Sequence, residues 1–444
     1  MALIRVPARP VKNLDDLPID TATKVLESAL SDFYRPSPQD IQAIRRIVGI
    51  ALAHALTNYA SEEQFVRLAK CRAPIVKEPP IIMLTGLGGV GKSEISKALE
   101  RLLLSHRRAR ISADLPEFPI TPLVTTLIGP NVRHVDVMNA VADCLGLEAS
   151  RWDMPEHHFG VRVRSNSTYI KADRDSIRHA KLRLYQQGVC CILGDEFQFL
   201  TRSREANALI TKLVAFFAVF GVPVVYICNY SAGHRLKMRP QEDRTRLLHD
   251  PIVVLPDPPD EPTYLDLLED YKVVFGGALD IDPKRDALAI HEMTFGLKRS
   301  AKRLLVIGYR IARSRTKKGE KVCVDMTDLR AAYMSISYED DRKTVEECHS
   351  ILMGIATKCE DLICPFDLPP SLVEVQRRLA ENALRRRHNH AMHNASMTPL
   401  ERTAAKEVQV KRDTAKGKLA VPIQAKRRKR ASVTAKDLLK SALF

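Results

Sequence analysis

The sequence contains no apolar run long enough to cross a bilayer, and its first residues lack the apolar stretch of a secretory signal. These two absences argue against a membrane protein and against an exported one, so we expect a cytoplasmic protein. No internal repeat is found either, which argues against a repeat architecture.

Nine cysteines are present, but none forms a CxxC pair, which removes the tight ligand pairs of common structural zinc sites. Cys190, Cys191 and Cys228 lie inside apolar runs, where a thiol behaves as a small buried hydrophobe. The only other grouping is widely spaced and comprises Cys348, His349, Cys359 and Cys364. We therefore interpret the cysteines as reduced cytosolic thiols rather than metal ligands.

The chain is basic, but the charge is uneven. Its 444 residues are 45% hydrophobic and 27% charged, and this predicts a globular protein with more than one domain. The net charge is +16, and from Ser371 onward 18 Lys and Arg face 6 Asp and Glu, an excess of 12. A basic tail usually meets nucleic acid or an acidic partner. A solvated tail without a dedicated partner is the alternative.

Short apolar runs alternate with amphipathic helices between residues 81 and 255. The runs are apolar without alternation, which is typical of strands buried on both faces of a parallel sheet. They are residues 81–85, 122–128, 189–193, 222–228 and 252–255. The intervening helices are expected at residues 93–103, 135–145, 176–187 and 206–220. This repetition predicts a doubly wound α/β fold, an αβα sandwich around a five-stranded parallel sheet.

Outside that region the sequence is mostly helical. Residues 1 to about 35 look irregular apart from an apolar patch at residues 25–33, and an apolar stripe predicts a helix after Asp40. Four helical patterns follow the sheet, at residues 264–274, 284–293, 297–313 and 326–335. The predicted domains are an N-terminal extension (1–68, largely helical), a nucleotide-binding core (69–258), a helical lid (259–340), a C-terminal helical region (341–387) and a basic flexible tail (388–444).

A phosphate-binding loop is the strongest motif. It matches G-x-x-x-x-G-K-[ST], follows an apolar strand and opens a helix. Its residues are Gly86, Leu87, Gly88, Gly89, Val90, Gly91, Lys92 and Ser93. Inward-pointing N–H groups and the helix N-terminus are suited to hold the phosphates of ATP. Lys92 is expected to neutralise β/γ oxygens and Ser93 to coordinate Mg²⁺.

Two further strands end in polar residues. One buried strand delivers Asp195 and Glu196 at its carboxyl end, where α/β sheets place their ligands. Asp195 is expected to hold the Mg²⁺ ion with its water shell, and Glu196 to activate the attacking water. The next strand ends at Asn229, which either hydrogen-bonds the γ-phosphate or the water, or makes an ordinary turn.

These three strands in this order, followed by a helical domain, resemble the AAA+ ATPases over about residues 60–340. The resemblance implies that Asn229 is the sensor-1 residue and that an arginine finger follows it. Arg235, Arg239, Arg244 and Arg246 are offered. Arg244 and Arg246 are preferred because they lie closest to the final strand, with surface arginines as the alternative. Lys298 and Arg299 are candidates for the sensor-2 cation, or belong to a solvated face.

Within AAA+, the chain is similar to the TnsC/TniB transposition regulators. The similarity rests on TGLGGVGKS in the phosphate loop, RPQEDRTRLLHDPIVVLP before the lid, and GLKRSAKRLLVIGYRIA in the lid. It implies a bacterial protein whose ATP-bound subunits assemble as a ring or helical oligomer on double-stranded DNA. A target-selector protein recruits that assembly, which then recruits and activates transposase subunits.

The DNA-contacting residues stay open. An insertion at residues 151–171, rich in basic residues, is either a DNA-channel element or a plain surface loop. The basic run at residues 426–430 suits a DNA backbone or a partner, or resembles a nuclear-localisation signal, which the bacterial resemblance argues against. The amphipathic end at residues 433–444 suits a partner groove or a frayed terminus.

Two other functions compete. One is a helicase loader or replication initiator with the same fold, although neither a helix-turn-helix nor a helicase-docking segment is clear in the sequence. The other is a nucleotide-gated signalling scaffold that does not bind DNA, although no effector enzyme or sensor repeat accompanies it.

Overall fold

The computed structural model describes ten continuous stretches up to residue 368, then residues 377–379 and seven single residues between 374 and 398. The stretches are residues 4–61, 63–65, 79–103, 108–109, 118–127, 184–185, 187–197, 220–316, 320–355 and 359–368. The chain divides into two compact units, Met1–Glu381 and Asn382–Phe444. The site described below lies entirely within the first unit.

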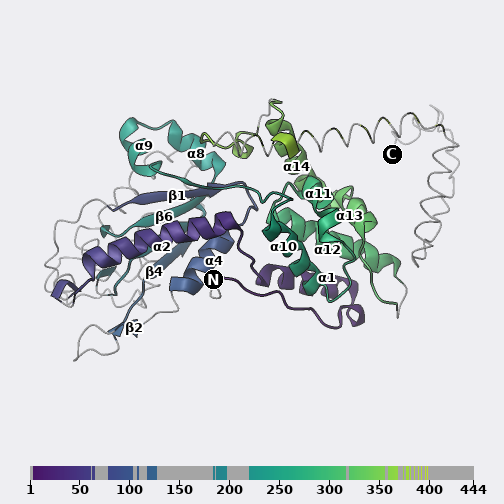
Figure 1. Ribbon diagram of the computed structural model, residues 1–444, viewed down its shortest axis with the longest axis horizontal. Coiled ribbons are helices and arrows are strands. Elements are labelled where there is room, and N and C mark those ends of the chain that lie inside the picture. The colour runs from purple at the N-terminus through teal and green to yellow at the C-terminus, as the bar shows by residue number, and fades with distance from the viewer. Residues whose placement is uncertain are drawn as a thin grey trace, which may run out of the picture. The chain divides into compact units, whose positions relative to one another are not determined.

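Five strands within residues 81–254 form one sheet (Figure 1). Its strands are β1 (Ile81–Gly86), β4 (Leu123–Leu127), β5 (Cys191–Asp195), β6 (Val224–Asn229) and β7 (Ile252–Val254), in the order β4-β5-β6-β1-β7. Every neighbouring pair in this sheet is parallel. All five predicted strands are confirmed. A separate antiparallel pair consists of β2 (Arg108–Ala109) and β3 (Phe118–Pro119).

The central strands bury both of their faces, as their unbroken apolar sequences predict. In β1, Ile82 and Leu84 face the cluster formed with α2 (Pro38–Asn58) and α4 (Lys92–Leu103). Ile81 and Met83 face the opposite cluster, which includes side chains of α8 (Tyr230–Lys237). The sheet is therefore covered on both sides, and the predicted αβα sandwich is confirmed.

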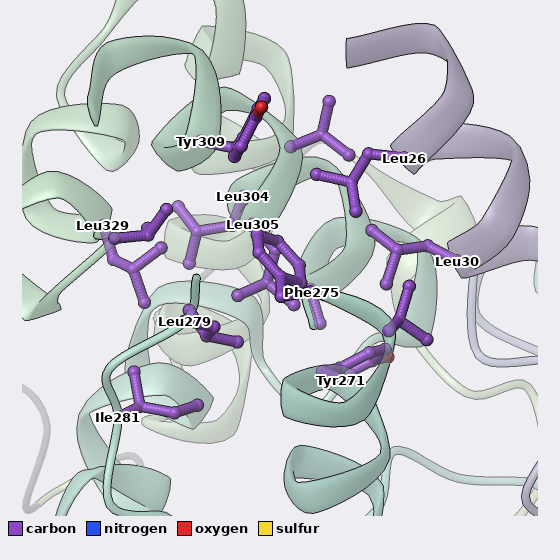
Figure 2. Close-up of a cluster of buried hydrophobic side chains, with 14 of the residues drawn as sticks. Leu26, Leu30, Tyr271, Phe275, Leu279, Ile281, Leu304, Leu305, Tyr309 and Leu329 are labelled. Atoms are coloured by element: carbon purple, nitrogen blue, oxygen red, sulfur yellow. The ribbon is translucent and has the colours of Figure 1, made fainter. Parts of the chain in front are cut away.

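The helical lid follows the sheet and has its own core. It contains α10 (Pro262–Val274), α11 (Pro283–Thr294), α12 (Lys298–Arg315) and α13 (Met326–Tyr333), which match the four predicted helices. Buried side chains of α10 and α12 form the centre of the cluster drawn in Figure 2, including Tyr271, Leu305 and Tyr309. Among the described residues, no helix is both long and apolar enough to span a bilayer.

The N-terminal extension is more ordered than the sequence suggested. The apolar patch belongs to a fourteen-residue helix, α1 (Ile19–Asp32), which directs Leu26 and Leu30 into the lid core (Figure 2). The sequence pattern alone predicted only an apolar patch and not the whole helix α1, because the buried side chains of α1 pack against residues of the lid. Helix α2, by contrast, packs on the sheet and starts with a capping box between Ser37 and Asp40.

After the lid, the chain returns to the nucleotide-binding region. Helix α14 (Glu339–Leu352) packs on α11, and the short η5 (Glu360–Leu362) lies against α8. There the His234 Nε2 atom lies 2.9 Å from the carbonyl oxygen of Ile363. Gly233 lets Pro365 approach α8, since a Cβ at this glycine would lie 2.6 Å from the Pro365 Cγ atom.

Several predicted features lie outside the described residues. They are the helices at 135–145 and 206–220, most of the helix at 176–187, the insertion at 151–171, and the tail segments at 426–430 and 433–444. The domain boundaries given above stay predictions.

Gly233→Ala tests the contact between the returning chain and α8. Alanine is the better helix former, yet its methyl group would collide with a rigid proline ring. We expect a loss of about 1–3 kcal/mol in the free energy of unfolding, measured by chemical denaturation. Gly49→Ala is the matched control, because that helical glycine has open space around its Cβ position, and it should gain up to about 1 kcal/mol. Equal effects of the two changes would contradict the proposed packing.

Candidate nucleotide site

The phosphate loop connects β1 to α4 at the carboxyl edge of the sheet. Gly89 and Gly91 have φ angles of 84° and 119°, in the region that favours glycine. The loop therefore curls in a way that a side chain at either position would oppose. Ser93 lies exposed in the first turn of α4. The predicted strand–loop–helix context is confirmed.

Lys92 lies under this loop and is largely buried. Its Nζ atom donates to the carbonyl oxygens of Gly86 and Leu87 at 2.9 and 2.8 Å. Burial above all, and the nearby positive charge of Arg299, lower the pKa of Lys92 to about 8, against an opposing effect of Asp195 and Glu196. The lysine is therefore a cation at neutral pH, held at the base of the loop.

The acidic pair lies at the end of β5, within electrostatic reach of Lys92. Asp195 accepts a hydrogen bond from the Glu196 backbone N–H at 2.7 Å. Glu196 itself has a φ of 61°, which is uncommon for a residue with a long side chain. Such a conformation costs on the order of 1 kcal/mol and is frequent at functional sites.

Asn229 ends β6, directly beside the start of the phosphate loop. It pairs in the parallel register with Gly86. Asn229 also occupies the N-cap position of α8, for which asparagine is among the best residues, but its side chain makes no capping hydrogen bond. The sensor-1 role and the ordinary turn therefore both stay predictions for Asn229.

The lid reaches the loop through the first turn of α12. The Arg299 backbone N–H donates to the Gly89 carbonyl oxygen at 3.1 Å. Arg299 is exposed, and its Cβ lies 2.8 Å from the position that a Cβ would take on Gly89. Lys298 is buried and forms ion pairs: its Nζ lies 2.6 Å from Asp40 Oδ2 and 3.5 Å from Asp257 Oδ2. The two sensor-2 candidates therefore have different surroundings.

The predicted finger arginines lie on one short helix. Arg244 and Arg246 belong to α9 (Gln241–Leu247) and are both exposed. Arg239 is instead buried, and its guanidinium lies 2.6 Å from the Asp243 carboxylate. Arg235 is exposed on α8. Arg235, Arg244 and Arg246 therefore face solvent, whereas Arg239 forms an internal ion pair with Asp243.

The residues at the edge of the sheet fit Mg²⁺. The Ser93 hydroxyl and the Asp195 carboxylate offer hard oxygen ligands, and Mg²⁺ typically takes few protein ligands and keeps several waters. In the part of the chain that the structure describes, no group of three or more His, Cys, Asp or Glu could hold a metal by itself. Cys348 and His349 are buried in the packing of α14.

The chain is distantly similar to solved structures of other proteins. No protein-family model and no curated protein sequence matches the chain. The Orc1 protein of Aeropyrum pernix, solved in complex with DNA, is 20% identical with a TM-score of 0.39, over 66% of this chain and 70% of that one. Cdc6p of Pyrobaculum aerophilum is 16% identical with a TM-score of 0.41, over 80% of this chain and 90% of that one.

The order of the strands decides the fold. The loop strand β1 lies between β7 and β6, the acidic strand β5 follows, and a helical lid succeeds β7. The chain has the AAA+ fold. At these low TM-scores and identities, the likeness to Orc1 and Cdc6p carries no further argument.

Sequence reasoning did not find the residues around Lys298 in this AAA+ site. Tyr34, Asp40 and Asp257 surround its ammonium group, and the Tyr34 ring centroid lies 5.8 Å from Nζ. No motif marks these positions. The only signal was the Ser-Pro-x-Asp start of α2, which predicts a helix cap and not a partner for a lid lysine.

Triphosphate binding is expected to depend on pH through Lys92. Bound phosphate oxygens raise the pKa of the lysine above its value of about 8, so binding takes up a proton at higher pH. The affinity should be highest below pH 8 and fall by up to about tenfold per pH unit above it. Calorimetric titration with an ATP analogue from pH 7 to 9.5 measures this. Lys92→Arg, which stays charged throughout, should flatten the profile, and a flat profile in the wild type would contradict the assignment.

Proposed function

We propose that this protein is a Mg²⁺-dependent ATPase whose nucleotide site controls its assembly on duplex DNA. One observation carries the proposal: Lys92 of α4, Asp195 and Glu196 at the end of β5, and Arg299 of α12 come from three separate elements, and the last three lie within electrostatic reach of the Lys92 ammonium at the carboxyl edge of the sheet. A purely structural loop would not need two acids and two cations there.

Each residue has a role that its position supports. The loop N–H groups and Lys92 hold the β- and γ-phosphates, while Ser93 and Asp195 hold the magnesium, which stabilises negative charge when bound. Glu196 orients and deprotonates the attacking water. Asn229, adjacent to Gly86 in register, positions that water or the γ-phosphate. Arg299 is assigned as the sensor-2 cation because its side chain is exposed, whereas that of Lys298 is buried.

Assembly into oligomers explains the exposed arginines. Arg244 and Arg246 lie on α9, beyond the strand that ends at Asn229. An arginine supplied by a neighbouring subunit stabilises transition-state charge only when copies stack in a ring or filament. Duplex DNA is the proposed partner of this assembly, because the chain carries a net charge of +16 and binding to the phosphate backbone is electrostatic.

The finer role has two candidates. Regulation of transposition, with transposase and target-selector partners, rests on the loop, linker and lid motifs quoted above. A helicase loader or replication initiator is the alternative; one of the two neighbours named above, the Orc1 protein, was solved in complex with DNA. Both roles share the ATPase and DNA-binding functions.

Lys92→Ala and Glu196→Gln should separate binding from hydrolysis. Loss of the loop lysine removes a charge-assisted contact, so ATP affinity should fall at least about tenfold. Glu196→Gln should bind ATP and remain on DNA, with hydrolysis slowed about 10²–10⁴-fold because the water lacks its base. Nucleotide binding, phosphate release and sedimentation with duplex DNA measure the three steps.

Lys97→Ala is the matched control for these variants. Lys97 lies on the same helix as Lys92 but is exposed and pairs with Glu94 at 3.1 Å. Its replacement should leave ATP affinity and turnover unchanged. Hydrolysis at the wild-type rate by Glu196→Gln would remove that residue from its role, and wild-type turnover that ignores duplex DNA would favour the signalling-scaffold alternative.

Sequencing of DNA fragments retained by the ATP-bound protein separates the two finer roles. A transposition regulator that reads only the backbone should retain genomic fragments almost uniformly, with an affinity that falls steeply with salt. An initiator that marks defined sites should enrich particular fragments, because base contacts add discrimination. Strong enrichment of a few sites would overturn the transposition role.

A further inference from the structure

Three charged side chains from three distant segments meet beside the phosphate loop. Asp40 belongs to the first turn of α2, Asp257 follows β7, and Lys298 is the first residue of α12. The Lys298 ammonium lies 2.6 Å from Asp40 and 3.5 Å from Asp257, and the three side chains are 10%, 0% and 8% exposed respectively. The N-terminal extension, the linker to the lid and the lid thus share one buried ion cluster.

The Asp40 carboxylate is held in place by Ser37, independently of its contact with Lys298. Its Oδ2 atom accepts a hydrogen bond from the Ser37 N–H at 3.0 Å, and the Asp40 N–H donates to the Ser37 hydroxyl at 3.3 Å. The capping box therefore holds the carboxylate at the start of α2. Because α2 packs on the sheet, Asp40 presents a fixed negative charge to whatever element lies next to it.

The ion cluster keeps Lys298 charged and occupied. Burial alone would lower the pKa of Lys298, but Asp40 and then Asp257 outweigh it, and the pKa is raised. Burial raises the pKa of Asp257, while Lys298 opposes that shift. An ammonium between two carboxylates is already neutralised, so it is a poor candidate for a second task at the triphosphate.

The same cluster sets where the next residue lies. The Lys298 side chain passes close over Gly91, with its Cδ 3.1 Å from the position of a Cβ there, and the Arg299 backbone bonds Gly89. The first turn of α12 is therefore held on the loop at two successive residues. Arg299 remains exposed, and its charge already reaches Lys92.

We infer that Asp40 is a positioning residue for γ-phosphate recognition: by holding Lys298, it places Arg299 where the triphosphate binds. This inference rests on the proposed ATPase function and deepens it. The two adjacent lid cations have different roles: Lys298 joins the lid to the N-terminal extension, and Arg299 faces the nucleotide. ATP is then distinguished from ADP by a contact that depends on a residue of α2.

A double-mutant cycle between Asp40→Asn and Arg299→Ala tests this inference. The readout is the ratio of the dissociation constants for ADP and for an ATP analogue. Each single change should lower that ratio by on the order of tenfold, which is the loss expected for one charge-assisted contact. The double variant should lose little more than either single one, because both changes act on the same contact. Thermal unfolding of each variant, measured in parallel, reports any general loss of stability.

Two matched controls share these charge changes. Arg310→Ala removes a cation from the same helix, where Arg310 is exposed. Asp266→Asn removes a carboxylate of α10 that pairs with Arg35. Neither should alter the preference for ATP. If Asp40→Asn weakens ATP and ADP equally, or if its effect adds in full to that of Arg299→Ala, Asp40 is only structural and the inference is overturned.

The Lys298→Met variant distinguishes a charge partner from a phosphate ligand. Alone, this change leaves two buried carboxylates without a cation, and ATP binding should fail as the lid loosens. Adding Asp40→Asn leaves a single carboxylate, so the cluster regains the net charge of the wild type, and ATP binding should return at least in part. Absence of any recovery in a folded double variant would make Lys298 a phosphate ligand.

Different results would refute the ATPase function and the role of Asp40. A wild-type protein that does not bind ATP with magnesium would refute the ATPase function itself. A wild-type protein that binds ATP, with an ATP preference unaffected by Asp40→Asn, would refute only the role of Asp40.

Discussion

The contact between the first turn of α12 and the phosphate loop joins the two halves of the nucleotide site. The lid has its own hydrophobic cluster, and the cluster on one face of the sheet also takes in Phe295 and Leu297, just before α12. What makes them one site is the short approach of Lys298 and Arg299 to Gly91 and Gly89, which only glycines allow at those loop positions. A ligand held by the loop is consequently within reach of the lid as well.

The N-terminal extension reinforces this contact from outside. Helix α1 lies in the lid core and α2 lies on the sheet, so the segment between them passes from one half to the other. Arg35, in that segment, pairs with Asp270 of α10 at 2.6 Å, while Gln39 accepts a hydrogen bond from the Leu255 backbone N–H at 3.0 Å. These contacts tie the extension to both the lid and the sheet.

Charge at the site is arranged in two groups with different solvation. Lys298, Asp40 and Asp257 form a buried cluster in which attraction between neighbours offsets the cost of desolvation. In the other group, Asp195 and Glu196 are half-buried and Arg299 is exposed, while Lys92 is buried beneath the phosphate loop. In the proposed function, the first group shapes the site and the second group carries out the chemistry. The second group is recognisable as sequence motifs because binding of phosphate and magnesium requires particular residue types.

The sequence by itself determined the five strands, the four lid helices and the phosphate loop, because continuous apolar runs, 3.6-residue periodicity and the glycine spacing are local properties. It also placed Asp195, Glu196 and Asn229 at strand ends, and the parallel register then brought Gly86 and Asn229 together. Only the tertiary structure decided that α1 joins the lid and that Lys298 is buried while Arg299 is exposed. Those outcomes depend on partners more than 200 residues away, such as Asp40 for Lys298, or on which face of a helix is covered, and neither leaves a local pattern.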